Sequence, residues 1–510
     1  MTAPVPPGRI LTALTRGSIR TLGSSAVVAA ALACLAGCSV PLAPGYDIQR
    51  ESLEVRYAGG APPRLTIRAT YQLRNVGNSE LTSIETTLPK EDVFGRQNLR
   101  VLIDNRAVAV QPVAKEKEDE DADRPKQLWS IPFDPPWPRK QKRSLLIEYD
   151  LAPAPPGVAA IAVNDGSFHL RPFGWFPVLQ TPEKLFAHDV VRPNPTPVSI
   201  VVPQGYFAIA TGDLVRVRPQ GVEVEYQFLL RKFDLDPFVV AGRYSEQEVR
   251  AKDGTIIFWT FAPLPPDAAK QAGARLASAW KAYEATFGPA SNKMQPVSPH
   301  IVETLAQIPA HFAQEGGPAG RAFLGGALLN RPAFILGVTS EEFLSLAERE
   351  LAQSWIGEQV ILQPHAELVM GLGFAEYAPI VAAEARGGAA ARRAAIQTRL
   401  RAYDDARANT VEKPIATITR QDSWELRQLA YSKGALFFAA LEDRCGEAPA
   451  RQAIAHLVRV LRGETGGFSE LRSAFEEQTG QNLADFFRTW LNQTGIPADF
   501  RARYEEGNGN

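Results

Sequence analysis

The sequence has few of the residues that build metal centres and disulfides. Its 510 residues include 3 cysteines and 6 histidines. No two histidines stand three or four positions apart, as they do where one helix face binds zinc. The G-x-S-x-G turn of many serine hydrolases and the phosphate-binding G-x-x-x-x-G-K-[ST] loop are also absent. The sequence therefore contains none of these three motifs for binding a metal ion, for a nucleophilic serine or for binding a nucleotide.

The chain also lacks an excess of charge of either sign. Its 55 basic and 56 acidic residues leave a formal charge of −1, so we expect no nucleic-acid partner. Hydrophobic residues make up 45% of the chain and charged residues 22%, which is typical of globular proteins. The 40 prolines and 39 glycines favour short strands and loops over a coiled coil. The length predicts roughly two to four domains.

The N-terminus has the features of an export signal. Arg9, Arg16 and Arg20 precede an apolar stretch over 26–37, which is shorter than the roughly 20 residues of a membrane-spanning helix. The stretch runs into L-A-G-C, which ends at Cys38 and resembles the lipobox of bacterial lipoproteins. That resemblance implies cleavage before Cys38 and acylation of its thiol. The alternative is an ordinary secretory signal with a chance cysteine.

The lipobox implies where the protein resides. Residues 1–37 are expected to be a lipoprotein signal peptide, and 38–50 a tether held to the membrane through lipidated Cys38. Ser39 stands where an aspartate would favour the inner membrane. We therefore expect a lipid-anchored protein of the bacterial cell envelope, on the outer membrane facing the periplasm rather than on the inner membrane.

Hydrophobic periodicity changes at about Pro265, after a long region with a period of two. From 51 to 245, apolar and polar residues alternate in short runs, such as L-T-I-R-A-T-Y over 65–71, with turn residues between them. Alternation with a period of two predicts strands with one buried face. We expect an N-terminal antiparallel β-sandwich domain over these residues.

The second half, 246–510, is predicted to be α+β and to end in helices. Residues 267–287 carry apolar side chains at three- and four-residue steps, as an amphipathic helix does. Short strands are expected over 296–336, and helices follow from about 339. Thr339 and Glu342 have the spacing of a capping box at the start of the first of these helices.

Three motifs of the helical part stand in the order and spacing of a known family. They are R-E-L-A-Q-S-W-I-G over 349–357, G-F-A-E-Y over 373–377 and Y-S-K-G-A over 431–435. Together they resemble the aminopeptidase N-type zinc metallopeptidases, gluzincins that carry H-E-L-A-H-Q-W-F-G, N-E-G-F-A-x-Y and Y-x-K-G-A. The resemblance implies a β domain followed by a thermolysin-like α+β domain of catalytic type, over about 246–510.

The resemblance fails at the three positions that bind zinc in the family. Arg349 and Gln353 stand in place of the two histidines, and Leu372 stands in place of the glutamate. A guanidinium keeps its proton and an isobutyl group has no donor atom, so neither binds a metal ion. An amide offers one neutral oxygen. We therefore expect no metal cofactor, or zinc only if other side chains bind it.

Two residues match catalytic positions of the family. Glu350 matches the general base and Tyr431 the tyrosine that stabilises the tetrahedral intermediate, although activity is doubtful without a metal-polarised water. Glu376 lies four residues after Leu372, which places both on one helix face. Because a buried arginine is rarely left without a counter-ion, we expect an ion pair between Arg349 and Glu376.

The amine-binding strand of the family's exopeptidases has no acidic counterpart. Those enzymes hold the substrate's α-amine with a glutamate in a G-A/G-M-E-N strand. The best match here, G-G-P-A-G over 316–320, lacks the acid, and Glu315 is out of register. The sequence therefore gives no support for aminopeptidase specificity.

Three hypotheses follow for function. The first is a catalytically inactive, lipid-anchored relative of these peptidases that binds or scaffolds a peptide or protein in the former substrate cleft. The second is an active metallopeptidase or aminopeptidase with non-standard metal ligands, drawn from Glu350, Glu376, Glu367 and His365. The third is a structural envelope component whose cleft is filled by its own side chains.

Overall fold

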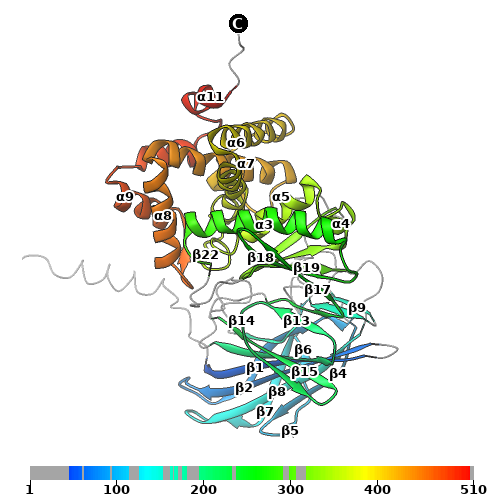
Figure 1. Ribbon diagram of the computed structural model, residues 1–510. Helices are drawn as coiled ribbons and strands as arrows, with labels where there is room; N and C mark the ends of the chain where they lie inside the picture. Colours follow the sequence, from blue (N-terminus) through cyan, green and yellow to red (C-terminus); the bar gives the residue numbers. More distant parts are fainter. Residues whose placement is uncertain are drawn as a thin grey trace, which may run out of the picture.

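The computed structural model describes residues 45–59, 63–91, 95–113, 126–152, 161–164, 166–170, 175–180, 195–231, 237–290, 298–305 and 317–505. The predicted signal peptide over 1–37 and Cys38 lie outside these residues. Strands gather in one half of the molecule and helices in the other, with a further sheet between them (Figure 1).

The N-terminal half contains three sheets. The largest has eight strands in the order β14 (Asp213–Gln220), β15 (Glu223–Leu230), β12 (Thr196–Pro203), β1 (Tyr46–Ala58), β2 (Arg64–Asn75), β8 (Lys142–Leu151), β4 (Arg96–Ile103) and β5 (Arg106–Ala107). Two four-stranded sheets consist of β13 (Phe207–Ala210), β16 (Val239–Gly242), β10 (Ser167–Leu170) and β9 (Ile161–Asn164), and of β11 (Val178–Gln180), β3 (Leu81–Pro89), β7 (Lys126–Trp137) and β6 (Gln111–Pro112).

Alternating burial explains why these strands pack as layers. Along β2 every second residue is buried, and the residues between face outward. One hydrophobic cluster joins Ile67 of the large sheet, Ile131 of β7 and Val239 of β16. Neighbouring strands are antiparallel except β1 and β12, which are parallel. The predicted N-terminal β domain of mainly antiparallel strands is therefore confirmed. It consists of three packed sheets, and one strand pair, β1 and β12, is parallel.

A five-stranded mixed sheet follows. Its order is β17 (Ser245–Ala251), β18 (Gly254–Thr260), β19 (His300–Thr304), β21 (Gly326–Asn330) and β20 (Gly320–Phe323). Ala327 and Leu329 pack against the helices, whereas Leu328 between them packs toward Phe238 of the N-terminal half. The two faces of this sheet thus bury different partners, because side chains alternate along a strand.

Helices cover the far face of this sheet and continue to the C-terminus. They are α3 (Pro266–Phe287), α4 (Arg331–Ile335), α5 (Glu341–Ala352), the π-helix η1 (Glu367–Gly373), α6 (Phe374–Ala408), the 3-10 helix η2 (Ile415–Thr417), α7 (Trp424–Cys445), α8 (Glu447–Val460), α9 (Phe468–Thr479), α10 (Ala484–Asn492) and α11 (Ala498–Tyr504). A two-stranded parallel sheet, β22 (Ile361–Leu362) and β23 (Thr465–Gly466), lies among them.

Two local predictions were wrong. Residues 46–50, predicted as part of the tether, belong to β1, which begins at Tyr46 and pairs with Asn75 there. The capping box predicted for Thr339 and Glu342 is replaced by Ser340, whose Oγ accepts from the Phe343 N–H at 3.2 Å. Since α5 begins at Glu341, the preceding residue occupies the N-cap position, and that residue is a serine.

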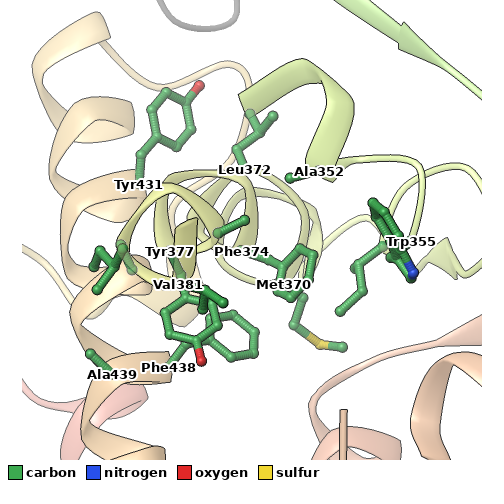
Figure 2. Close-up of a cluster of buried hydrophobic side chains, with 14 of the residues drawn as sticks. Ala352, Trp355, Met370, Leu372, Phe374, Tyr377, Val381, Tyr431, Phe438 and Ala439 are labelled. Atoms are coloured by element: carbon green, nitrogen blue, oxygen red, sulfur yellow. The ribbon is translucent and has the colours of Figure 1, made fainter. Parts of the chain in front are cut away.

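Among the described residues, one helical segment is long and apolar enough to cross a membrane. It spans Glu367–Ala408, and 78% of its most apolar window is buried inside the protein. Its apolar residues therefore pack in the core of the helical half, as the cluster in Figure 2 illustrates for Leu372, Phe374, Tyr377 and Val381.

Candidate functional site

Helix α5 places Glu350 against the edge strand of the five-stranded sheet. Glu350 is fully buried, and a Cβ atom at position 320 would lie only 2.6 Å from Glu350 Cγ. Only glycine allows the side chain to approach β20 so closely. Gly320, the last residue of the glycine-rich segment matched to the amine-binding strand, therefore has a packing role beside Glu350.

The environment of Glu350 favours its protonated form. Burial raises the pKa of Glu350 to about 8, although the Arg349 and Arg321 charges oppose that shift. Gln353 Nε2 donates to Glu350 Oε2 at 2.7 Å, and the Ala322 backbone N–H also acts against the rise in pKa. A carboxyl group that is mostly protonated at neutral pH cannot accept a proton as a general base.

Arg349 lies in the last turn of α5 and contacts the start of α6. Its Nη1 lies 3.5 Å from Glu376 Oε1 and donates to Ser345 Oγ at 3.3 Å. The other carboxylate oxygen of Glu376 pairs with Arg399. Glu376 thus bridges two arginines, all three side chains being largely buried. The ion pair expected between Arg349 and Glu376 is present.

Leu372 is buried among apolar side chains. It is 3% exposed and lies in η1, four residues before Glu376. It belongs to the same hydrophobic cluster as Ala352 at the end of α5 and Tyr431 of α7 (Figure 2). The end of α5 therefore meets the junction of η1 and α6, which brings the three family ligand positions to one region.

Helix α7 packs backbone to backbone on this junction. A Cβ atom on Gly373 would lie 2.8 Å from the Gly434 Cα. Lys433 is completely buried and donates to the Gln493 carbonyl at 2.6 Å. Two residues of the Y-S-K-G-A motif thus have structural roles. Tyr431 is 1% exposed, and burial raises the pKa of its hydroxyl to about 12.

The residues at this site do not fit a zinc ion. Arginine and leucine supply no ligand atom, and the Gln353 amide is already committed to Glu350. The charges of Arg349 and Arg399 would repel a divalent cation. In the part of the chain that the structure describes, no group of three histidine, cysteine, aspartate or glutamate side chains is placed to hold a metal.

The alternative ligands suggested by the sequence are engaged elsewhere. Both carboxylate oxygens of Glu367 pair with Arg420. The His365 ring packs on Phe468, with 5.7 Å between ring centroids. Glu376 is paired with two arginines, as described above. The four side chains proposed as non-standard ligands therefore form no metal-binding group.

Sequence reasoning missed Arg399. In a straight helix, 23 residues would separate Arg399 from Glu376 by about 35 Å. The chain instead reverses at Gly388, whose φ of 65° and ψ of −159° are not helical, so the second part of α6 runs back along the first. The glycine pair at 387–388 is a helix-breaking signal that could have suggested this reversal.

Asn330 is a second residue that was missed. Its Oδ1 accepts from the Ala319 N–H at 2.9 Å, and its Nδ2 donates to the Gly317 carbonyl at 2.8 Å. These bonds fix the described part of the glycine-rich segment beside β21. Gly316 and Glu315 lie outside the described residues.

The chain is similar to known proteins in part of its sequence and in its fold. Residues 326–490 match the peptidase family M1 domain. The crystal structure of an M1 zinc metallopeptidase from Deinococcus radiodurans has a TM-score of 0.59 at 18% identity, covering 89% of this chain and 95% of that chain. Yeast LTA4 hydrolase in complex with bestatin has a TM-score of 0.62 at 12% identity, covering 89% of this chain and 68% of that chain.

The resemblance deduced from the sequence is therefore confirmed. The chain shares its overall fold, a β domain followed by a helical domain, with these structures, and residues 326–490 match the M1 peptidase domain. No curated protein sequence matches the chain.

Proposed function

We propose that this chain is a zinc-free relative of the M1 metallopeptidases that binds a peptide or protein without hydrolysing it. The observation that carries the proposal is the bridge from Arg349 through Glu376 to Arg399. It places two positive charges and one negative charge at the junction of α5 and α6. A protein that retained zinc chemistry would need ligand atoms at this junction instead.

Glu350 supports the same proposal. A general base must be ionised near the working pH and must face the proton it removes. Glu350 has a pKa of about 8 and holds the Gln353 amide. Its role is therefore to fill the space beside Gly320 and to anchor the end of α5.

The edge strand β20 offers a place for an extended peptide. It is the outermost strand of its sheet, and edge strands pair readily with added segments. Arg321 on this strand is only partly buried and adds a positive charge close to Glu350. A Deinococcus radiodurans M1 relative has been crystallised with a Tyr-Ser-Ala substrate, which makes that tripeptide a suitable probe.

Hydrolysis and binding of the tripeptide test the proposal together. The full chain should bind Tyr-Ser-Ala saturably in a calorimetric titration, and the peptide should remain intact. Binding should weaken in Arg321→Ala and persist in Arg250→Ala, a matched change on β17 where the side chain is 80% exposed. Cleavage that a chelator abolishes and that Glu350→Gln also abolishes would instead establish an active metallopeptidase.

We further propose that Cys38 anchors the chain in the bacterial cell envelope, on the outer membrane facing the periplasm. The support is the order of positive residues, short apolar stretch and L-A-G-C in the sequence. Two or more acyl chains give stable membrane attachment, whereas one gives only reversible binding. Such an anchor would hold the peptide-binding domain close to the membrane.

A further inference from the structure

A cavity of about 240 Å³ lies where the N-terminal half meets the five-stranded sheet. Its walls come from β13, the start of β14 and β15 on one side. On the other side they come from the C-terminal end of β18, the N-terminal end of β19 and the turn between β20 and β21. The lining residues are Ala208, Ile209, Ala210, Gly212, Asp213, Leu214, Tyr226, Phe228, Trp259, Ala290, His300, Phe323, Leu324 and Gly325.

The cavity is separate from the site around Glu350. It lies at the turn end of β20, beside Phe323, whereas Glu350 packs on Gly320 at the other end of that strand. His300, which lines it, is the first residue of β19. None of the residues assigned above to the former zinc region contributes to its walls.

The walls are apolar and rich in aromatic rings. Trp259 meets the His300 ring edge to face, with 5.6 Å between centroids, and Phe323 belongs to the same hydrophobic cluster as Trp259. Rings arranged in this way contact a further aromatic ring favourably, through offset or edge-to-face packing. The lining therefore suits a flat aromatic body better than a flexible polar one.

Among the residues that the structure describes, two ring nitrogens next to the cavity have no hydrogen-bond partner. They are the Trp259 Nε1 and the His300 Nδ1, both buried. Burial also lowers the pKa of His300 to about 4, so its imidazole is neutral at physiological pH. Neutral polar groups without partners in an apolar wall can be satisfied by one polar group of a bound molecule.

The charge around the cavity argues against an anionic occupant. Asp213 is the one carboxylate among the lining residues and is only partly buried, as is Leu324, so both lie toward the solvent side. No cationic side chain lines the cavity among these residues. Transfer of a charged group into such surroundings would be strongly unfavourable.

We propose that this cavity is a binding site for a small, uncharged aromatic molecule that carries one hydrogen-bonding group. An apolar protein cavity of about 150 Å³ accepts benzene, so this larger cavity has room for a ring with a short substituent. The cavity touches β20 only at its last residue, Phe323, and contains neither Gly320 nor Arg321, which lie on the part of β20 proposed to bind peptide.

Benzyl alcohol is the probe that tests the site, with benzoate as its charged counterpart. Titration of the full chain, followed by calorimetry and by the melting temperature, should show saturable binding of benzyl alcohol and a rise in melting temperature. Benzoate should produce neither effect. Equal binding of both, or binding of neither, would overturn the proposal.

Variants locate the binding. Leu324→Trp places a larger ring at the partly exposed side of the cavity and should weaken benzyl alcohol binding about tenfold or more, which corresponds to about 1.4 kcal/mol. The control is Leu336→Trp, which enlarges an exposed leucine outside the cavity and should leave binding unchanged. If both tryptophan variants bind like the parent chain, the molecule binds elsewhere and the proposal is wrong.

His300→Phe tests the hydrogen-bonding group of the cavity. This variant should retain toluene binding but weaken binding of benzyl alcohol.

Discussion

Arg349 of α5 and Glu376 of α6 contact each other with 3.5 Å between Nη1 and Oε1. Glu376 also pairs with Arg399, which returns to this point after the reversal at Gly388. The two arginines share this one buried carboxylate, which offsets part of the repulsion between their guanidinium groups. The junction of α5 and α6 thus contains an ion-pair bridge among its own side chains.

Glu376→Gln should destabilise the protein strongly. The substitution leaves Arg399 and Arg349 near one another without a carboxylate, and breaking a buried ion pair costs about 3–5 kcal/mol. Urea unfolding of the full chain measures the effect. Glu248→Gln breaks an exposed pair with Arg250 and should leave the unfolding midpoint unchanged. Equal midpoints for Glu376→Gln and the parent chain would show that the bridge contributes nothing.

Glu350 should make stability depend on pH. Its pKa rises from an ordinary 4.5 to about 8 in the folded protein, so the folded state binds the proton more tightly than the unfolded state. The contribution of this group is therefore complete below about pH 4.5 and is lost as pH rises toward 8, at up to about 1.4 kcal/mol per pH unit.

Glu350→Gln removes this titration while keeping a side chain of similar size. The free energy of unfolding of the variant, relative to that of the parent chain, should increase between pH 5 and pH 8. Urea titrations at four pH values in this range measure the difference. A difference that stays constant with pH would mean that Glu350 ionises normally inside the protein.

Zinc binding should be recoverable by restoring the family's ligands. The triple variant Arg349→His, Gln353→His and Leu372→Glu supplies two imidazoles and a carboxylate around the junction of α5 and η1. It should bind about one zinc per chain after dialysis, whereas Leu372→Glu alone should bind none. Failure of the folded triple variant to bind zinc would show that the three positions do not converge as described.

Cys38 should carry the lipid. Cells fed a labelled fatty acid should incorporate the label into the full chain and place the protein in the outer-membrane fraction. Cys38→Ser should abolish both the label and the membrane fractionation. The control is Cys445→Ser, which alters a buried cysteine of α7 and should retain both. Label that persists in Cys38→Ser would contradict the lipobox interpretation.

Much of the fold could be predicted because its signals are local. The alternation over 65–71 lies within β2, and the periodicity over 267–287 matches α3 apart from one residue at its start. The expected strands within 296–336 are β19, β20 and β21. Each of these patterns depends on neighbours in the sequence, so a period of two or 3.6 is sufficient to recognise it.

The parts that could not be predicted depend on contacts between distant residues. Nothing near Arg399 in the sequence indicates that Gly388 reverses the chain and returns it to Glu376. The cavity between the two halves brings together Ala208, His300 and Phe323, which come from separate strands. The raised pKa of Glu350 follows from its burial against Gly320, which only the folded chain produces.

The zinc content of the purified full chain tests the central claim most directly. The chain should be incubated with excess zinc, dialysed against metal-free buffer and measured by elemental analysis, with the triple ligand variant as the positive control. We expect far less than one zinc per chain, because Arg349, Gln353 and Leu372 cannot bind the ion. About one tightly held zinc per chain would contradict the account.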